Sequence, residues 1–211
     1  MAKENGLRYR GLCVLCSFIL ALTGCGAAGG PDEIELIDEM SQIDFDIDYP
    51  VGQITQGVIV TQDFVSNAPI ITQIWLYGAT YMRENTATVD VVLFCDKGSA
   101  PAGEDETGKD GEKGDSTKDG MTQLATWTID SSKMEDNSII KLDVPESELN
   151  MDMNGVHCLI EISSPDGEPE KSPTFWMTEE DVYPDGSLGI NGYAQYNDLW
   201  FQVIGKDNPE M

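Results

Sequence analysis

The chain has 211 residues and a formal charge of −26, with 12 Lys and Arg residues against 38 Asp and Glu residues. A surface this acidic repels nucleic acid and anionic lipid head groups, so we do not expect nucleic acid as a partner. It favours solubility, cations or basic partners, and the length suits one domain with a tether.

The first residues have the three parts of a secretory signal peptide. Basic residues lie within positions 1–10, and residues 11–22 carry no charge. Small residues then precede Cys25, at the place where cleavage falls in such a signal. The apolar run is too short to cross a bilayer core of about 30 Å as a helix. We therefore expect residues 1–24 to be removed.

The four residues at the end of this signal read Leu22-Thr23-Gly24-Cys25. They resemble the bacterial lipobox, and the resemblance implies that Cys25 carries a diacylglyceryl thioether. Acyl chains such as palmitate contribute about 0.8 kcal/mol per buried methylene, so two or more chains anchor a protein stably. We expect a lipoprotein held at the cell surface, on the extracytoplasmic face of a cell membrane. The alternative is an ordinary secretory signal that contains a cysteine.

Residues 25–42 are expected to form the lipid anchor and a flexible acidic tether, because they begin with glycine and alanine and continue with acidic residues. Over residues 43–49, apolar residues alternate with aspartates. A period of two is typical of a half-buried strand and predicts an edge strand here. The folded domain is therefore expected over residues 43–207.

The rest of the chain is expected to be all-β. Runs rich in Val, Ile, Thr, Trp and Phe alternate with Gly, Pro, Asn or Asp, and no long amphipathic helix pattern occurs. The pattern predicts an antiparallel β-sandwich, and within that class a jelly roll. The expected strands cover residues 56–64, 70–81, 86–95, 123–130, 138–144, 156–163, 174–178, 188–191 and 198–204.

One stretch, residues 96–120, interrupts this pattern. It contains no Val, Ile, Leu or aromatic residue, so it cannot form a packed core. We expect a disordered, acidic, glycine-rich insertion between two strands, because lengthening such a loop costs little entropy. A collagen helix would need many more Gly triplets and more proline.

Two cysteines remain after the signal peptide and the lipidated residue are set aside. Cys95 and Cys158 both lie on the apolar face of a predicted strand. A secreted chain permits a disulfide between them. The alternative is two buried thiols that pack as small hydrophobic residues.

Two stretches near the C-terminus are the most specific part of a family resemblance. Residues 183–188 read Tyr-Pro-Asp-Gly-Ser-Leu, and residues 198–201 read Asp-Leu-Trp-Phe. With the order of the other elements, they resemble a jelly-roll module of bacterial cell-envelope proteins, over roughly residues 50–205. That module is similar to galactose-binding-like domains and carbohydrate-binding modules. The resemblance implies a fold and a recognition role but carries over no ligand residues, because jelly rolls serve unrelated functions.

An aromatic platform for sugar is the first candidate site. Residues 70–81 alternate aliphatic side chains with aromatic or polar ones. If the aliphatic face is core, the other face and the following loop present the candidate ligand-binding residues Gln73, Trp75, Tyr77, Tyr81 and Arg83. The alternative is that other strands or the N-terminal segment cover them. Three further tryptophans alternate with polar neighbours and are expected in the core: Trp127, Trp176 and Trp200.

A structural Ca²⁺ site is the second candidate. Ca²⁺ takes six to eight oxygen ligands, and four carboxylates flank the turn at residues 183–186: Glu179, Glu180, Asp181 and Asp185. The alternative is a plain β-turn, which Pro-Asp-Gly also signals. The aspartates within residues 43–49 would lie about 6.6 Å apart along a strand, which is a poor ligand arrangement.

The sequence carries no signature of catalysis. Its single histidine, His157, lies on the polar face of a strand, and a lone histidine needs Cys or carboxylates to complete a zinc site. The sequence has no Gly-x-Ser-x-Gly elbow, phosphate loop or dinucleotide fingerprint. We expect a non-enzymatic lipoprotein that presents a recognition module for a glycan or an envelope partner, without a cofactor. The alternatives are an accessory lipoprotein that docks to an envelope protein complex and, third, a glycan-processing enzyme.

Overall fold

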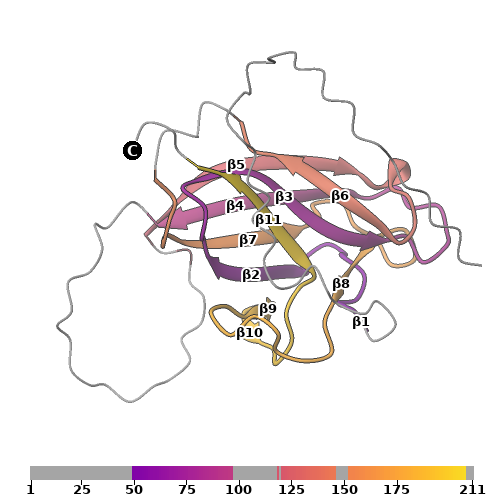
Figure 1. Ribbon diagram of the computed structural model, residues 1–211. Coiled ribbons are helices and arrows are strands. Elements are labelled where there is room, and N and C mark those ends of the chain that lie inside the picture. The colour runs from indigo at the N-terminus through magenta and orange to yellow at the C-terminus, as the bar shows by residue number, and fades with distance from the viewer. Residues whose placement is uncertain (1–48, 97–117, 119, 146–151, 208–211) are drawn as a thin grey trace, which may run out of the picture. The chain divides into compact units, whose positions relative to one another are not determined.

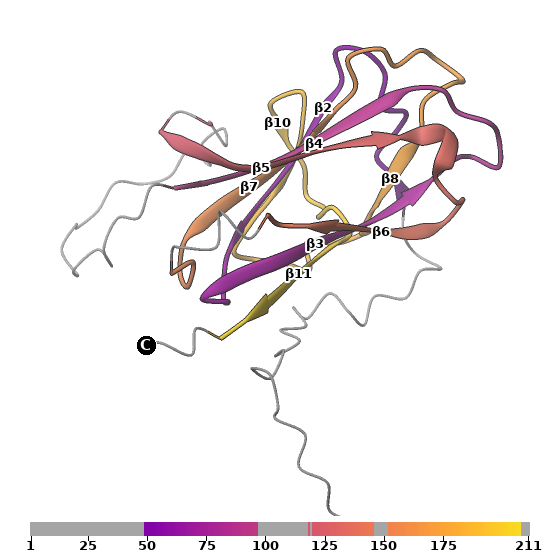
Figure 2. The same cartoon turned by 90° about the horizontal axis from the view of Figure 1, so that it is seen from above.

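The computed structural model describes residues 49–96, 118, 120–145 and 152–207. These residues form two antiparallel β-sheets, which lie in two layers (Figures 1 and 2). In the five-stranded sheet, β3 is central, with β6 on one side and β8 and β11 on the other. Its strands are β1 (Tyr49–Pro50), β3 (Ile70–Ala79), β6 (Ser138–Asp143), β8 (Thr174–Met177) and β11 (Phe201–Lys206).

The second sheet has six strands in the order β10-β9-β2-β7-β4-β5. Their bounds are β2 (Ile59–Val65), β4 (Thr88–Asp96), β5 (Met121–Asp130), β7 (His157–Ser163), β9 (Leu188–Ile190) and β10 (Tyr193–Ala194). A short 3₁₀ helix, η3 (Ser131–Lys133), follows β5. In the described part of the chain, no helix is long and apolar enough to cross a membrane.

The prediction of an all-β fold is confirmed, and the nine strands expected between residues 56 and 204 are present with ends shifted by a few residues at most. The strand expected to reach Tyr81 ends at Ala79, because Tyr81 and Met82 have positive φ angles of 57° and 56°. Such angles belong to the left-handed region and cannot continue a strand. The jelly-roll topology stays a prediction.

Several predicted segments lie outside the described residues. They are the signal peptide (1–24), the lipidated Cys25, the tether (25–42), nearly all of the edge strand at 43–49 and residues 97–117 of the insertion. Of the edge strand, Tyr49 is described, and it forms β1 with Pro50.

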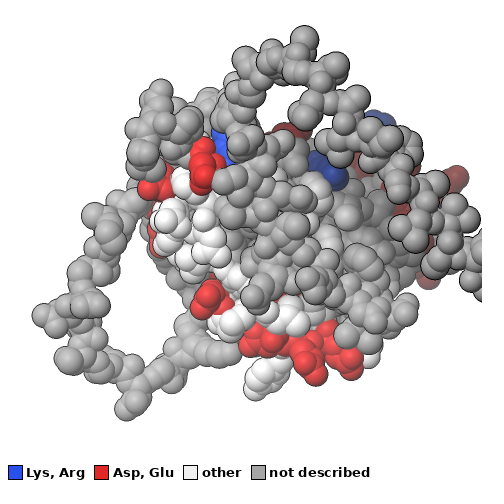
Figure 3. Space-filling view, in the orientation of Figure 1, with Lys and Arg blue, Asp and Glu red and all other residues white. Residues whose placement is uncertain are grey.

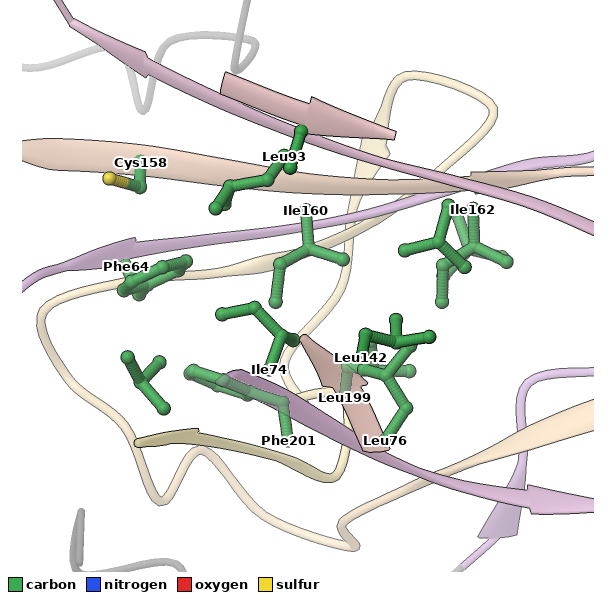
Figure 4. Close-up of a cluster of buried hydrophobic side chains, with 14 of the residues drawn as sticks. Phe64, Ile74, Leu76, Leu93, Leu142, Cys158, Ile160, Ile162, Leu199 and Phe201 are labelled. Carbon is green, nitrogen blue, oxygen red and sulfur yellow. The ribbon is translucent and has the colours of Figure 1, made fainter. Parts of the chain in front are cut away.

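The core lies between the two sheets. Leu93, Ile160 and Ile162 of the six-stranded sheet point toward apolar side chains of the other sheet (Figure 4). Those partners are Ile74, Leu76, Leu142 and Phe201. Alternation along each strand therefore sends every second side chain inward, and each fully buried Leu, Ile or Phe contributes about 1.5–3 kcal/mol.

A disulfide joins Cys95 and Cys158, which is the first of the two alternatives considered from the sequence. Cys95 is on β4 and Cys158 lies directly opposite on β7, with 4.0 Å between their Cα atoms. Both residues are buried. The bond therefore ties together two inner strands of the six-stranded sheet.

Candidate functional site

The outer face of the five-stranded sheet carries the aromatic side chains of β3. Ile74 and Leu76 are fully buried in the core, so Gln73, Trp75 and Tyr77 point outward, where they are half-buried. The aliphatic face is thus the core face, as the platform hypothesis requires. We call Gln73, Trp75, Tyr77 and Trp176, with the polar side chains around them, the aromatic platform.

Aromatic rings from neighbouring strands extend this row. Tyr77 stacks on Trp176 of β8, with ring centroids 5.9 Å apart and an interplanar angle of 26°. The ring of Trp200 lies 5.5 Å from that of Tyr77 on its β11 side. Aromatic pairs at these separations stabilise one another by about 0.5–1.5 kcal/mol, so the rings form a firm surface.

Polar groups border the row. The Trp75 ring N–H donates to Gln73 Oε1 at 2.8 Å, and the Gln73 amide donates to Asp143 Oδ1 at 2.6 Å. Lys141 Nζ lies 3.8 Å from the centroid of the Trp75 ring, a cation–π contact. Trp176 donates to the side chain of Asn137 at 3.2 Å. The platform therefore combines flat apolar rings with hydrogen-bonding groups at their edges.

The accessible part of this face lies toward β6. On β6, Ile139 sits opposite Tyr77 and is 42% exposed, and Lys141 sits opposite Trp75 and is exposed. On the other side of β3, the outer-face residues of β11 are buried: Gln202 and Ile204. A ligand would therefore reach the platform over β6 and β8.

Tyr81 and Arg83 do not belong to this surface. They lie in the loop after β3, where the guanidinium stacks on the Tyr81 ring at 4.9 Å. Arg83 Nη2 donates to Gln53 Oε1 at 2.8 Å and to the Ser172 carbonyl at 3.0 Å, and Nε donates to Asn85 Oδ1 at 3.3 Å. These bonds occupy the guanidinium, so its role is to hold the loop.

Asp136 fixes the same loop from the other side. Its Oδ1 accepts the Thr80 N–H at 2.6 Å, the Thr80 hydroxyl at 2.8 Å and the Met82 N–H at 3.4 Å. Burial acts to raise the pKa of Asp136, but these donors outweigh it and hold the pKa below the ordinary 3.8. The positive φ angles of Tyr81 and Met82 are thus stabilised by one carboxylate.

The four carboxylates considered for Ca²⁺ do not form a ligand set. All four are exposed, and within the described ranges no three His, Cys, Asp or Glu side chains gather in a metal-binding group. The Gly186 N–H donates to the Tyr183 carbonyl at 3.2 Å, which closes an ordinary β-turn. Acidic side chains do gather along the lower edge of the view in Figure 3, but they point to solvent.

The carboxylate that organises this region is Asp198, which the sequence did not single out. Its Oδ2 accepts the N–H groups of Val182 and Tyr183 at 2.8 and 2.9 Å, and its Oδ1 accepts the Gln62 amide at 3.1 Å. Gln62 Oε1 in turn accepts the Leu199 N–H at 2.7 Å. Burial raises the pKa of Asp198 above 3.8, against the N–H donors, which lower it.

Gln62 is fully buried and points into the core between Val60 and Phe64. The only sequence signal for this network is a polar residue at an inward position of an apolar strand. A buried amide needs partners, and the segment before β11 supplies the Asp198 carboxylate and the Leu199 N–H.

His157 has the wrong surroundings for acyl transfer. Its Nε2 lies 3.4 Å from Asp63 Oδ2, while Asp63 Oδ1 accepts the Ser187 N–H at 2.7 Å and its hydroxyl at 2.9 Å. In a Ser-His-Asp triad the imidazole lies between the other two groups and takes the serine proton. Here the carboxylate is in the middle, so the arrangement ties β2 to the start of β9.

The three tryptophans expected in the core lie in different places. Trp127 packs against the core and donates its ring N–H to the Asp143 carbonyl at 2.7 Å. Trp200 is buried, but against Tyr77 on the outer face. The prediction for Trp176 is wrong, because Phe175 takes the inward position of β8 and turns Trp176 outward.

Comparisons of the chain with protein-family models, with curated proteins and with solved structures find no match.

Proposed function

We propose that this chain is a membrane-anchored extracytoplasmic lipoprotein whose β-sandwich binds glycan, without catalysis, on the aromatic platform. The observation that carries the proposal is the row formed by Trp75, Tyr77 and Trp176 on one sheet face, bordered by Gln73 and Lys141. The fold proposed for this module is a jelly roll, similar to carbohydrate-binding modules.

The chemistry of the platform suits a sugar. The C–H groups on one face of a pyranose ring are apolar and pack on an indole, while its hydroxyls need donors and acceptors at the edge. Lys141 is exposed on a flexible stem, so a sugar ring can replace its ammonium over Trp75. The displaced ammonium and the Asp143 carboxylate then bond to hydroxyls.

The extracytoplasmic location is supported by two independent features. The chain begins with a signal-peptide pattern that ends in the lipobox-like Leu22–Cys25 segment. The Cys95–Cys158 disulfide is of the kind that persists in oxidising compartments. Mass spectrometry of the protein purified from native membranes tests the anchor, because an unmodified Cys25 thiol would contradict it.

Glycan binding is tested by sedimentation with insoluble cell-wall polysaccharide and on a glycan array. Trp75→Ala and Trp176→Ala each remove one stacking ring, and each is expected to weaken binding about tenfold, or about 1.4 kcal/mol. Tyr196→Ala is the matched control, since Tyr196 is 87% exposed and lies outside the strands of both sheets. Urea midpoints establish that each variant is folded. Equal binding by all four proteins would contradict the platform.

An accessory role is the second candidate, favoured by the strongly acidic surface. A net charge of −26 attracts a basic protein surface and steers its association. In that case cell-wall polysaccharide leaves the chain in solution, while an envelope protein complex retains it in a salt-dependent way. Trp75→Ala and Trp176→Ala would then still be retained by the complex, with the same dependence on salt.

A further inference from the structure

A pocket of about 150 Å³ opens on the outer face of the six-stranded sheet, away from the sheet that carries the platform. Three neighbouring strands form its floor, since Glu161 of β7 lies opposite Thr61 of β2, and Thr61 lies opposite Gly189 of β9. Across the sheet, the pocket floor therefore presents the Glu161 carboxylate, then the Thr61 hydroxyl, and then Gly189, which has no side chain.

Gly189 keeps the floor open. A Cβ atom added there would meet the Thr61 hydroxyl oxygen. The β9–β10 hairpin forms a wall and turns at Asn191 and Gly192, whose φ angles of 52° and 79° fit a two-residue type I′ turn. Asn191 fixes this wall to β2, because its N–H donates to the Ile59 carbonyl and its Oδ1 accepts the Ile59 N–H, both at 2.8 Å.

An ion pair between a buried carboxylate and an exposed ammonium borders the pocket. Glu161 is 8% exposed, and its carboxylate pairs with the ammonium of Lys118. The same ammonium lies 5.3 Å from the Phe94 ring centroid. An ionised carboxylate has about four acceptor positions, and a buried charge is stabilised by each hydrogen bond it accepts. Glu161 therefore presents acceptor capacity to whatever enters the pocket.

We propose that this pocket binds a small, uncharged, hydroxyl-rich ligand of monosaccharide size. The charges of Glu161 and Lys118 cancel, so an ionic ligand would bring an uncompensated charge into a half-enclosed site. A neutral polyol satisfies both groups, because its hydroxyls donate to Glu161 and accept from Lys118. Ile59 in the lining, whose side chain is 40% exposed, meets its C–H groups.

The size of the pocket sets the size of the ligand. About 150 Å³ corresponds to about five water molecules at about 30 Å³ each. One sugar ring replaces that water, whereas an oligosaccharide would extend out of the pocket. The site is independent of the aromatic platform, because the two lie on the outer faces of different sheets.

The test is a titration of the ¹⁵N-labelled full chain with N-acetylglucosamine, glucose and galactose, followed by NMR. At least one sugar is expected to shift the amide signals of Gly189 and Gly192 in a saturable way. Glu161→Gln and Thr61→Val are each expected to weaken this binding about tenfold. Ammonium chloride and sodium acetate, as charged probes, are expected to leave the signals in place.

Two controls separate this pocket from other effects. Thr126→Val makes the same chemical change as Thr61→Val on the same sheet face, outside the pocket, and keeps full affinity. Trp75→Ala is also expected to keep full affinity of the pocket for the sugar, although this variant weakens binding of polysaccharide to the platform. A failure of the pocket proposal can therefore be distinguished from a failure of the platform proposal. The proposal is overturned if none of the sugars moves the signals, if a charged probe saturates them, or if folded Glu161→Gln and Thr61→Val bind like the unchanged chain.

Discussion

Loss of the Cys95–Cys158 disulfide lowers the free energy of unfolding by an amount that follows from the separation of the two cysteines along the chain. The two residues are 63 positions apart. In the chain-entropy account, a cross-link stabilises the fold by restricting the unfolded chain, by about 3 kcal/mol for a 15-residue loop and about 4.7 kcal/mol for a 100-residue loop. The loop here gives about 4 kcal/mol, which is a large share of the stability of a typical domain.

Urea unfolding of the Cys95→Ala/Cys158→Ala double variant measures this cost. With an m value of about 2 kcal/mol per M, a loss of about 4 kcal/mol lowers the midpoint by about 2 M. The m value itself is expected to rise, because an uncrosslinked unfolded chain exposes more surface. The matched control is the unchanged chain in excess reductant, which loses the bond but keeps both sulfur atoms in the core.

A stabilising role of the disulfide is refuted if the double variant and the reduced chain each lose less than about 1 kcal/mol of unfolding free energy while mass spectrometry finds the unchanged chain fully oxidised. In that case the bond would not restrict the unfolded state, and the pairing of β4 with β7 would be equally stable without it.

Three further changes test the polar contacts. Gln62→Leu leaves Asp198 Oδ1 and the Leu199 N–H without their core partner, and urea unfolding should show a loss of about 3 kcal/mol; a loss under 1 kcal/mol would contradict the network. The lowered pKa of Asp136 means that its stabilisation is present above pH 3.8 and is lost as the pH falls through its folded-state pKa. The stability gap between Asp136→Ala and the unchanged chain should therefore narrow from pH 6 to pH 2 in urea titrations, and a constant gap would contradict this. Arg83→Ala should cost about 2 kcal/mol yet leave glycan-array binding unchanged, whereas loss of binding by the folded variant would return Arg83 to the ligand site.

The polar residues of the candidate site show where single-strand patterns stop being informative. Gln73 and Arg83 are both polar residues two positions from an aromatic one, Trp75 and Tyr81 respectively. In the fold, Gln73 is part of the platform, while Arg83 is held by Gln53 and Ser172, which are far from it along the chain. Which of two similar side chains is available to a ligand depends on partners that only the folded chain brings near.

The sequence by itself determined the all-β class and the strand positions, because a period of two in apolar side chains is a local property of an extended backbone. It also determined that Gln73, Trp75 and Tyr77 share one face of β3. Only the tertiary structure decided which face is core, that Trp176 lies beside Tyr77, and that Glu161, Thr61 and Gly189 line up across three strands. These relations depend on strand order and register, which are set by long-range pairing rather than by any one strand's pattern.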